Sequence, residues 1–192
     1  VPAPVRAIMS DENVRIDAFL GPSHVSVITG SKIYKELASE FKRPIAISGF
    51  EPLDIMASVL NLVRQQNAGT YEVYNEYARA VKEEGNVKAK ELIAKYFEPC
   101  DFVWRGLGEI AQSGMKLKDE FAYLDARVQF DCSVESAGES KACICGQILR
   151  GLAKPTDCKV FGKVCNPQNP LGSCMVSGEG ACAAYFKYAR VG

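Results

Sequence analysis

The sequence carries no net charge and has no long hydrophobic run. Its 192 residues contain 23 Lys or Arg and 23 Asp or Glu, so no overall charge draws the chain to nucleic acids or anionic membranes. No apolar stretch approaches the ~18–20 residues that a membrane-spanning helix needs. The first residues, VPAPVRAIMSDENV, lack the basic and apolar regions of a signal peptide. The sequence therefore predicts a cytoplasmic protein without a membrane anchor or a nucleic-acid partner.

The paired C-x2-C spacing of zinc knuckles is also absent, although the chain has eight cysteines. The repeated C-x2 steps of bacterial ferredoxins are missing as well. Six cysteines fall within KACICGQILRGLAKPTDCKVFGKVCNPQNPLGSCMVSGEGACAAY, residues 141–185. In a chain without a secretion signal, such a group favours metal or redox chemistry over a disulfide scaffold. Cys100 and Cys132 stand apart and are interpreted as small buried residues.

Positive charge is concentrated in the same part of the chain. From Lys141 to the C-terminus, seven Lys or Arg face only Asp157 and Glu179, so the rest of the chain is negative by five. Nearby cations favour thiolates and stabilise the negative charge of an iron–sulfur cluster. The charge distribution therefore supports a metal or cluster site here, rather than a solvated basic surface alone.

The first 75 residues alternate between apolar stretches and amphipathic segments. Apolar, strand-like stretches occur at residues 15–21, 24–30 and 43–49. A helix is predicted at 31–41, with Ser31 as its N-cap. A second helix is predicted over 51–69, with Pro52 in its first turn and Gly69 after its end. This order predicts an α/β fold with a parallel sheet and right-handed crossovers.

One face of the second predicted helix is apolar. It consists of Leu53, Met56, Leu60 and Val63.

The pattern changes after Thr70. Residues 71–97 are interpreted as one long helix, or as two helices broken at Gly85-Asn86. Residues 101–108 are predicted to form a strand that leads into a glycine turn, and the chain beyond Gly138 is rich in loops. We therefore expect two domains, an α/β domain over 1–75 and a helix- and loop-rich [4Fe–4S] domain over 76–192.

The junction between the strand at 43–49 and the following helix is a candidate binding site. Ligands of parallel sheets gather at the carboxyl ends of the strands, where Gly49, Glu51 and Asp54 lie. Asp54 is interpreted as a helix cap, whereas the role of Glu51 stays open. His24, the single histidine, is either a hydrogen-bonded structural residue or part of the same cleft.

The cysteine spacing permits one set of four ligands and one remaining pair. Cys143, Cys158, Cys165 and Cys182 form a C-x14-C-x6-C-x16-C pattern. Cys145 and Cys174 remain beside it, which suggests a dithiol or disulfide next to an electron source. Spacing alone does not decide whether Cys143 or Cys145 is the ligand.

This pattern resembles the HypD family of [NiFe]-hydrogenase maturation proteins, in which C-x14-C-x6-C-x16-C is the cluster motif. The resemblance covers nearly the whole chain. Its further blocks are GPSHVSVITG (21–30), ISGFEPLDI (47–55), YNEYARAVKEEGN (74–86), WRGLGEIAQSG (104–114) and DCKVFGKVCNPQNPLGSCMVSGEGACAAYFKY (157–188). One small departure is EIAQSG, where the family pattern has proline after the isoleucine.

The resemblance implies a scaffold that carries a [4Fe–4S] cluster rather than a turnover enzyme. The four cysteines of the motif would ligate the cluster, and Cys145 and Cys174 would form a redox pair for electron relay. A HypC-like chaperone would share an Fe(CN)2CO unit with the scaffold, and a HypE-like protein would donate cyanide. His24, Gly49 and Glu51 would face the cleft where this unit is assembled.

The family's Cys-Gly-x-His motif, whose cysteine helps hold the iron, and its C-P-x-C motif are missing from this sequence. The resemblance therefore covers the middle and C-terminal parts of the family chain. The sequence is either a fragment of a longer chain or one half of a split protein, and in the second case a separate N-terminal half is an expected partner. Two other functions remain open. One is a free-standing iron–sulfur thiol–disulfide reductase that uses Cys145 and Cys174, and the other is a zinc-binding structural module, which the cysteine spacing disfavours.

Overall fold

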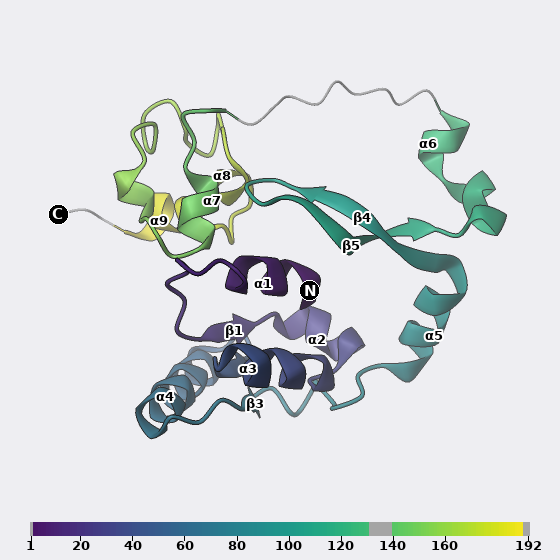
Figure 1. Cartoon of the computed structure of the whole chain (residues 1–192), viewed down its shortest axis with the longest axis horizontal. Coiled ribbons are helices and arrows are strands. Elements are labelled where there is room, and N and C mark those ends of the chain that lie inside the picture. Colours follow the sequence, from purple (N-terminus) through teal and green to yellow (C-terminus); the bar gives the residue numbers. More distant parts are fainter. Residues whose placement is uncertain (1, 131–139, 190–192) are drawn as a thin grey trace. The chain divides into compact units, whose positions relative to one another are not determined.

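The computed structural model describes residues 2–130 and 140–189 (Figure 1). The chain forms two compact units. The first consists of residues 2–6, 16–98 and 115–121, and the second of residues 7–15, 99–114, 122–130 and 140–189. The boundary expected near Asn75 does not coincide with these units, because residues 76–98 belong to the first one.

A three-stranded parallel sheet lies at the centre of the first unit, which confirms the predicted α/β class. The strands are β1 (Phe19–Gly21), β2 (Ile45–Ile47) and β3 (Val73–Asn75), in the order β1-β2-β3. Phe19 pairs with Ile45, and Ile45 pairs with Val73. All three residues of β2 are buried, as expected for the central strand of a parallel sheet that is covered on both faces.

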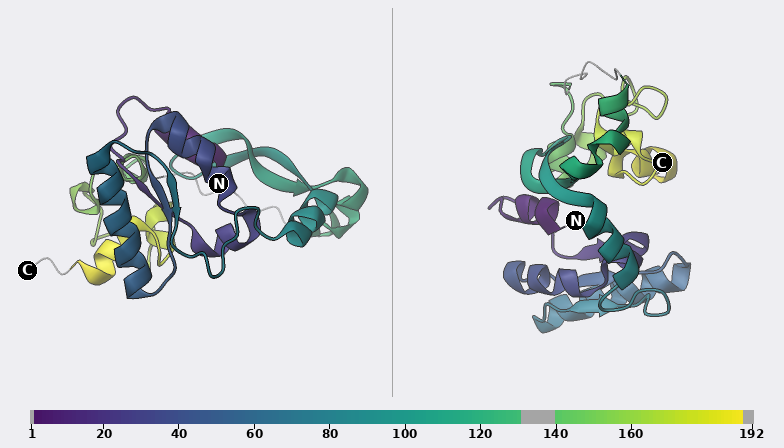
Figure 2. Two further views of the ribbon diagram at one scale, coloured as in Figure 1. Left: turned by 90° about the horizontal axis from the view of Figure 1, so that it is seen from below. Right: turned by 90° about the vertical axis from the view of Figure 1, so that its right-hand side faces the viewer.

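Short helices connect these strands. They are α2 (Ser23–Thr29), the 3-10 helix η1 (Lys32–Tyr34), α3 (Lys35–Phe41) and α4 (Pro52–Ala68), and the chain begins with α1 (Pro2–Met9). Helix α4 packs along β2, and Figure 2 shows it running beside the sheet. Its predicted ends are confirmed, because Pro52 opens the helix and Gly69 follows it in the left-handed conformation with φ 67°.

The buried core of this unit comes from both predicted and unpredicted segments. Tyr34, Leu37 and Ala38 pack from the η1–α3 segment against Ile45 and Ile47 of β2. Val81 joins the same core from the chain after β3. This packing of Val81 explains why the first unit continues past Asn75.

Several local predictions differ from the structure. Residues 24–30, interpreted as a strand-like stretch, lie largely in helix α2, because tertiary packing overrides the β-propensity of a run rich in valine and isoleucine. Residues 73–75 form β3 rather than part of a long helix. Of the one or two helices expected across 71–97, only α5 (Val87–Tyr96) forms. It begins at the break predicted at Gly85-Asn86, where the Asn86 side chain accepts a hydrogen bond from the Ala89 N–H at 3.0 Å. Ser31 makes no side-chain cap bond.

A β-hairpin follows α5, as the strand and glycine turn at 101–108 predict. It consists of β4 (Phe97–Trp104) and β5 (Gly108–Leu117). The Trp104 indole Nε1–H donates a hydrogen bond to Ser113 Oγ across the hairpin at 2.7 Å. The 3-10 helix η2 (Asp119–Leu124) and the short helix α6 (Ala126–Gln129) come next.

The last described segment, residues 140–189, has only short helices. They are α7 (Cys145–Leu149), the 3-10 helix η3 (Pro155–Asp157), α8 (Ser173–Val176) and α9 (Ala181–Tyr188), and Figure 2 shows α9 in yellow. The predicted loop-rich character of this segment is confirmed. Within residues 2–130 and 140–189, no helix has the length and apolar character needed to cross a membrane.

Candidate functional site

Six cysteine side chains of the second unit line one small cavity. Three come from the helical segments: Cys145 begins α7, Cys174 lies on α8 and Cys182 lies on α9. The other three come from loops. The cysteines around the cavity are Cys143, Cys145, Cys158, Cys165, Cys174 and Cys182, and Ile148, Phe161, Gly172 and Met175 complete its wall.

These thiols also form the core of their segment. Five of the six cysteines are buried, and Cys143 is half-buried. Met175 and Ala183 are buried in the same cluster, and Phe161 and Leu171 pack against it. The segment therefore has a core made largely of sulfur, in place of the aliphatic side chains that usually fill an interior.

The backbone approaches cysteine residues of the cavity closely at two glycines. A Cβ added at Gly172 would overlap the sulfur of Cys143, and one added at Gly180 would overlap the carbonyl of Cys174. The backbone N–H of Leu171 donates to Cys165 Sγ at 3.4 Å. Glycine is therefore needed at position 172 for the chain to pass beside a thiol.

Cys145 and Cys174 lie closest together. Their sulfur atoms are 2.7 Å apart, and the Cys145 sulfur also lies 3.1 Å from the hydroxyl of Ser173. The structure therefore brings together the two cysteines that remain outside the proposed four-ligand set.

Three of the six thiols, those of Cys143, Cys174 and Cys182, have raised pKa values and therefore favour the protonated form. Burial raises the pKa of Cys143, although the backbone N–H of Cys145 acts in the opposite direction. Burial and the surrounding sulfurs raise the pKa of Cys182 to about 11. The hydrogen bond with Cys145, followed by burial, raises the pKa of Cys174. Metal binding here would displace protons.

Other cysteines lie elsewhere. Cys100 is half-buried on β4 rather than fully buried, and Cys132 lies outside the described residues. Across the described ranges, no three His, Cys, Asp or Glu side chains form a group able to hold a single metal ion.

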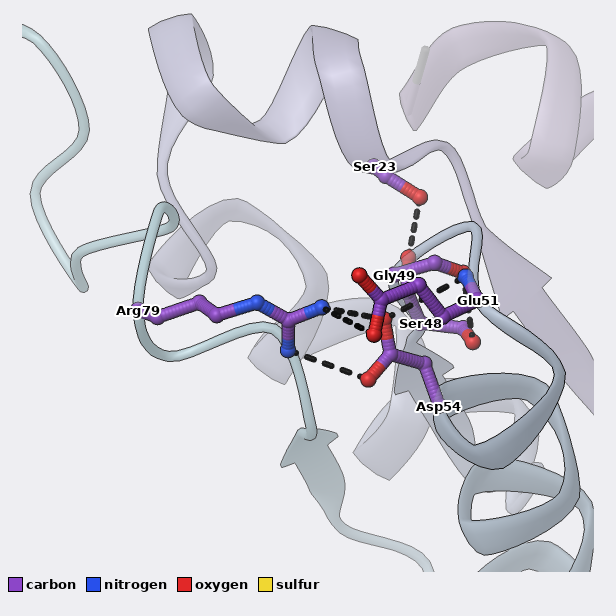
Figure 3. Close-up of polar contacts among 6 residues, drawn as sticks. All are labelled: Ser23, Ser48, Gly49, Glu51, Asp54 and Arg79. Atoms are coloured by element: carbon purple, nitrogen blue, oxygen red, sulfur yellow. Dashed lines mark hydrogen bonds and ion pairs between the residues drawn. The ribbon is translucent and has the colours of Figure 1, made fainter.

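A second candidate site lies at the carboxyl end of β2, where the sequence suggested one (Figure 3). The Arg79 guanidinium donates to both carboxylate oxygens of Asp54, with Nη1 3.0 Å from Oδ1. Asp54 also accepts a bond from the backbone N–H of Glu51 at 3.4 Å, which completes the helix cap. A Cβ at Gly49 would overlap the Asp54 carboxylate. These contacts fix the loop between β2 and α4.

The charged groups around this loop shift one another's pKa values. Hydrogen bonds from Arg79 lower the pKa of Asp54. Burial, followed by the charge of Asp54, raises the pKa of Glu76, and one buried oxygen of Glu76 has no hydrogen-bond partner. The second site is therefore a compact cluster of carboxylates with one arginine.

The three cleft candidates of the sequence lie in this region of the first unit. The ring of His24 stacks on Phe50, with centroids 6.0 Å apart, and both side chains are exposed. Gly49 is buried, whereas Glu51 is exposed and lies 3.8 Å from Arg79. Arg79 was missed because it follows β3, and β3 itself was interpreted as helix.

The fold and the site define a class: an α/β protein with a multi-cysteine centre built from widely spaced single thiols. The comparisons with known proteins identify that class more closely. The sequence of residues 1–189 matches the family model HypD, whose description reads 'Hydrogenase formation hypA family'. The chain therefore belongs to the HypD family.

The relatives carry names that agree with this family. The chain is 53% identical to hydrogenase maturation factor HypD2 of Bradyrhizobium diazoefficiens over 178 residues, which are 92% of this chain and 47% of the relative. It is 47% identical over 196 residues to hydrogenase maturation factor HypD of Cupriavidus necator, covering 98% of this chain and 52% of that one. The HypD of Rhizobium leguminosarum is also 47% identical, with 98% and 51% covered. The chain thus spans about half the length of the curated relatives it matches.

Proposed function

We propose that this chain is the iron–sulfur part of a hydrogenase maturation factor and that it holds a [4Fe–4S] cluster. The observation that supports this most directly is that six thiols, spread over 40 residues of sequence, line one cavity. The proposed ligands are Cys143, Cys158, Cys165 and Cys182. Membership of the HypD family supports the maturation role.

The residues around the cavity fit such a cluster. A [4Fe–4S] cluster takes four thiolate ligands, and the six cysteines supply four with two to spare. Gly172 keeps the wall beside Cys143 free of a side chain that would overlap its sulfur. The basic residues of this segment favour the negative charge of a thiolate-bound cluster. When bound, the cluster supplies one-electron transfer.

Cys145 and Cys174 are proposed to be a redox-active pair. Oxidation of the two thiols forms one S–S bond and releases two electrons and two protons, and reduction reverses the step. The 2.7 Å between their sulfurs supports this role, because little movement is needed for the bond to form. Their burial restricts the exchange with external thiols on which such pairs otherwise depend.

The cargo of the complete factor is proposed to be an Fe(CN)2CO unit, shared with a HypC-like chaperone and supplied with cyanide by a HypE-like protein. The family motif that holds this iron lies outside the present sequence. The part of the family chain with this motif either belongs to the same polypeptide or is supplied by a second one, which would then be a further partner. His24, Gly49 and Glu51 are proposed to face the cargo, a role supported by their position at the carboxyl end of the sheet.

A free-standing thiol–disulfide reductase is the second candidate, favoured by the same proximity of Cys145 and Cys174. Such an enzyme must expose its attacking thiolate to a substrate disulfide. Both cysteines are only 5% exposed. This burial favours the scaffold over the reductase.

Iron and sulfide analysis tests the proposal. After anaerobic purification or reconstitution, the chain is expected to hold about four irons and about four sulfides. Cys158→Ser should remove most of this iron, whereas the matched control Cys100→Ser should retain it. Stoichiometric zinc without acid-labile sulfide in the reconstituted chain would contradict the proposal and support a zinc module.

A further inference from the structure

Helix α4 has its polar and apolar faces reversed relative to an ordinary surface helix. Leu53, Met56, Leu60 and Val63 are 79%, 68%, 50% and 51% exposed. Of the four buried residues of this helix, Asp54, Ser58 and Gln65 are polar, and Leu62 is apolar. In a surface helix of a globular protein, the apolar stripe faces the core and the polar face meets water.

The buried polar face is held in place by specific bonds. Asp54 accepts the guanidinium of Arg79 at one end of the helix. Near the other end, the Gln65 side-chain oxygen accepts the backbone N–H of Glu72 at 2.7 Å. Turning the helix to bury its apolar face would break both contacts. The exposed stripe is therefore a fixed feature of the fold.

The spacing of the exposed residues matches a helix–helix interface. Leu53, Met56, Leu60 and Val63, which we call the α4 seam, follow steps of three, four and three residues. Such a 3–4 alternation is the a/d pattern by which one helix packs its side chains into the grooves of another. Arg64 and Asp54 are the only charged residues within α4, and Asp54 is buried. The exposed side of the helix therefore carries little charge that would favour its hydration.

We propose that the α4 seam binds a helix from the part of a HypD-family chain that the present sequence does not span. The matched relatives are about twice as long as this chain, since it covers 47–52% of their length. A family member therefore carries about as much polypeptide again, and that polypeptide needs a surface on which to pack.

A second copy of this chain is a weaker occupant. A 17-residue helix is roughly 25 Å long and about 10 Å wide. One such face offers a few hundred Å², well below the ~800 Å² per partner of a stable interface. The other half of a family-length chain can contact further surfaces besides the seam, so the seam does not have to supply the whole interface.

Co-expression tests this proposal without requiring iron. The tagged chain would be produced together with an untagged polypeptide that contains the part of the Cupriavidus necator relative outside the matched region. About one copy should co-purify per chain. Met56→Lys with Leu60→Lys should reduce the co-purified amount about tenfold or more, since two charges would be buried at the centre of the interface. The matched control is Leu124→Lys with Val128→Lys, whose wild-type side chains are 54% and 67% exposed, and it should have no effect.

Two measurements on the chain alone keep the result interpretable. The seam variant should melt within about 2 °C of the wild type, as expected for exposed positions. Met56→Cys should react with a maleimide as fast as Val128→Cys in the chain alone, and about tenfold more slowly in the co-purified complex. Site-resolved mass spectrometry separates these positions from the native cysteines.

Several outcomes would overturn the proposal. Equal co-purification of wild type and seam variant, or no co-purification with the wild type, would show that the seam does not bind this partner. A concentration-dependent dimer that the seam variant abolishes would assign the face to a second copy. A seam variant that unfolds by itself would show that the chain already covers the seam. Each of these results leaves the iron and sulfide analysis unaffected, so this inference and the proposed function fail separately.

Discussion

The sulfur atoms of Cys145 and Cys174 lie 2.7 Å apart, although 29 positions separate the two residues in sequence. Cys145 is the first residue of α7, and Cys174 lies within α8. The loop of residues 150–172 thus returns the chain to its starting point. The fold of residues 140–189 thus places a dithiol beside the remaining four thiols.

Mild oxidation of the chain should join these two cysteines selectively. The expected product has a mass lower by two hydrogens, and peptide mapping should recover Cys145 linked to Cys174. Proximity favours this pair over all others, because bond formation requires close, correctly oriented sulfurs. A predominant Cys143–Cys145 link, or random pairing among the six thiols, would contradict the proposed arrangement. Cys100→Ser serves as a control that leaves the product unchanged.

Serine substitution should separate ligands from the redox pair. Cys143→Ser should abolish or cripple the iron centre, since one of four thiolate ligands is lost. Cys145→Ser should retain the iron and eliminate the oxidisable pair. Iron content and the visible absorption of the anaerobic protein measure both effects. The reverse result, with iron lost only from Cys145→Ser, would make Cys145 the ligand and leave Cys143 free.

Gly172→Ala should weaken iron binding about tenfold or more, a loss typical of changes next to metal ligands. The added methyl group would overlap the Cys143 sulfur and displace it from its position in the cavity wall. Gly178→Ala is a matched control in the same segment, because a Cβ at that glycine has no heavy atom within 4 Å. Competition with a chelator measures the relative affinities. Equal affinities for the two variants would show that the Cys143 sulfur is free to adjust.

The stability of the first unit should depend on pH through Asp54. Because Arg79 donates to its carboxylate, the pKa of Asp54 in the folded chain lies below the usual 3.8. A lowered pKa stabilises the fold above about pH 3.8, and this contribution is lost as the pH falls through the folded-state value. Arg79→Gln should therefore lower the urea midpoint above pH 3.8, and the difference from wild type should vanish in more acidic solution.

The other charged groups around Asp54 are Glu51, Glu76 and Arg79. Glu76 acts in the opposite direction, because its pKa in the folded chain lies above the usual value of 4.5. Its contribution to the stability of the fold is therefore lost as the pH rises from 4.5 through the folded-state pKa. Glu76→Gln should flatten the pH dependence on that side. Hydrogen exchange of the β2 amides in urea monitors this unit specifically. A pH-independent effect of Arg79→Gln would show that the arginine acts through packing alone, for example through its contact with the ring of Tyr77.

Removal of the proposed cluster should loosen one part of the chain selectively. Residues 140–189 have short helices and a core made mainly of cysteines, so metal ligation is expected to hold their shape. The sheet around β2 has its own core of Tyr34, Leu37 and Val81. Hydrogen exchange should therefore rise in 140–189 and remain slow in β2. Equal protection of both regions in the metal-free chain would contradict this dependence.

The sequence predicted best where single residues determine the backbone. Pro52 and Gly69 marked both ends of α4 correctly, because proline suits the first helical turn and glycine adopts the left-handed conformation after the last one. The six clustered cysteines were likewise recognisable from composition. Their common cavity supports the spacing argument, and the division into four ligands and one pair remains a prediction.

The sequence predicted poorly where long-range packing decides. Residues 24–30 have the composition of a strand, yet most of them form α2, and Tyr34 of the adjacent segment bonds to Ser26 in its interior. Residues 73–75 pair with β2, a partner 28 residues away, and nothing in their local pattern shows it. Arg79 was missed for the same reason, since its partner Asp54 is distant in sequence and only the sheet brings them together.

The order of the elements along the chain also sets the timing of their assembly. All three strands of the sheet are complete at Asn75, about 70 residues before the first thiol of the cavity, Cys143. At ~5–20 residues per second, a ribosome needs roughly 4–14 s to cover that distance. The three strands of the sheet are thus made seconds before any cavity cysteine is synthesised. Iron for the proposed cluster would accordingly be delivered only after the strands of the sheet have been made.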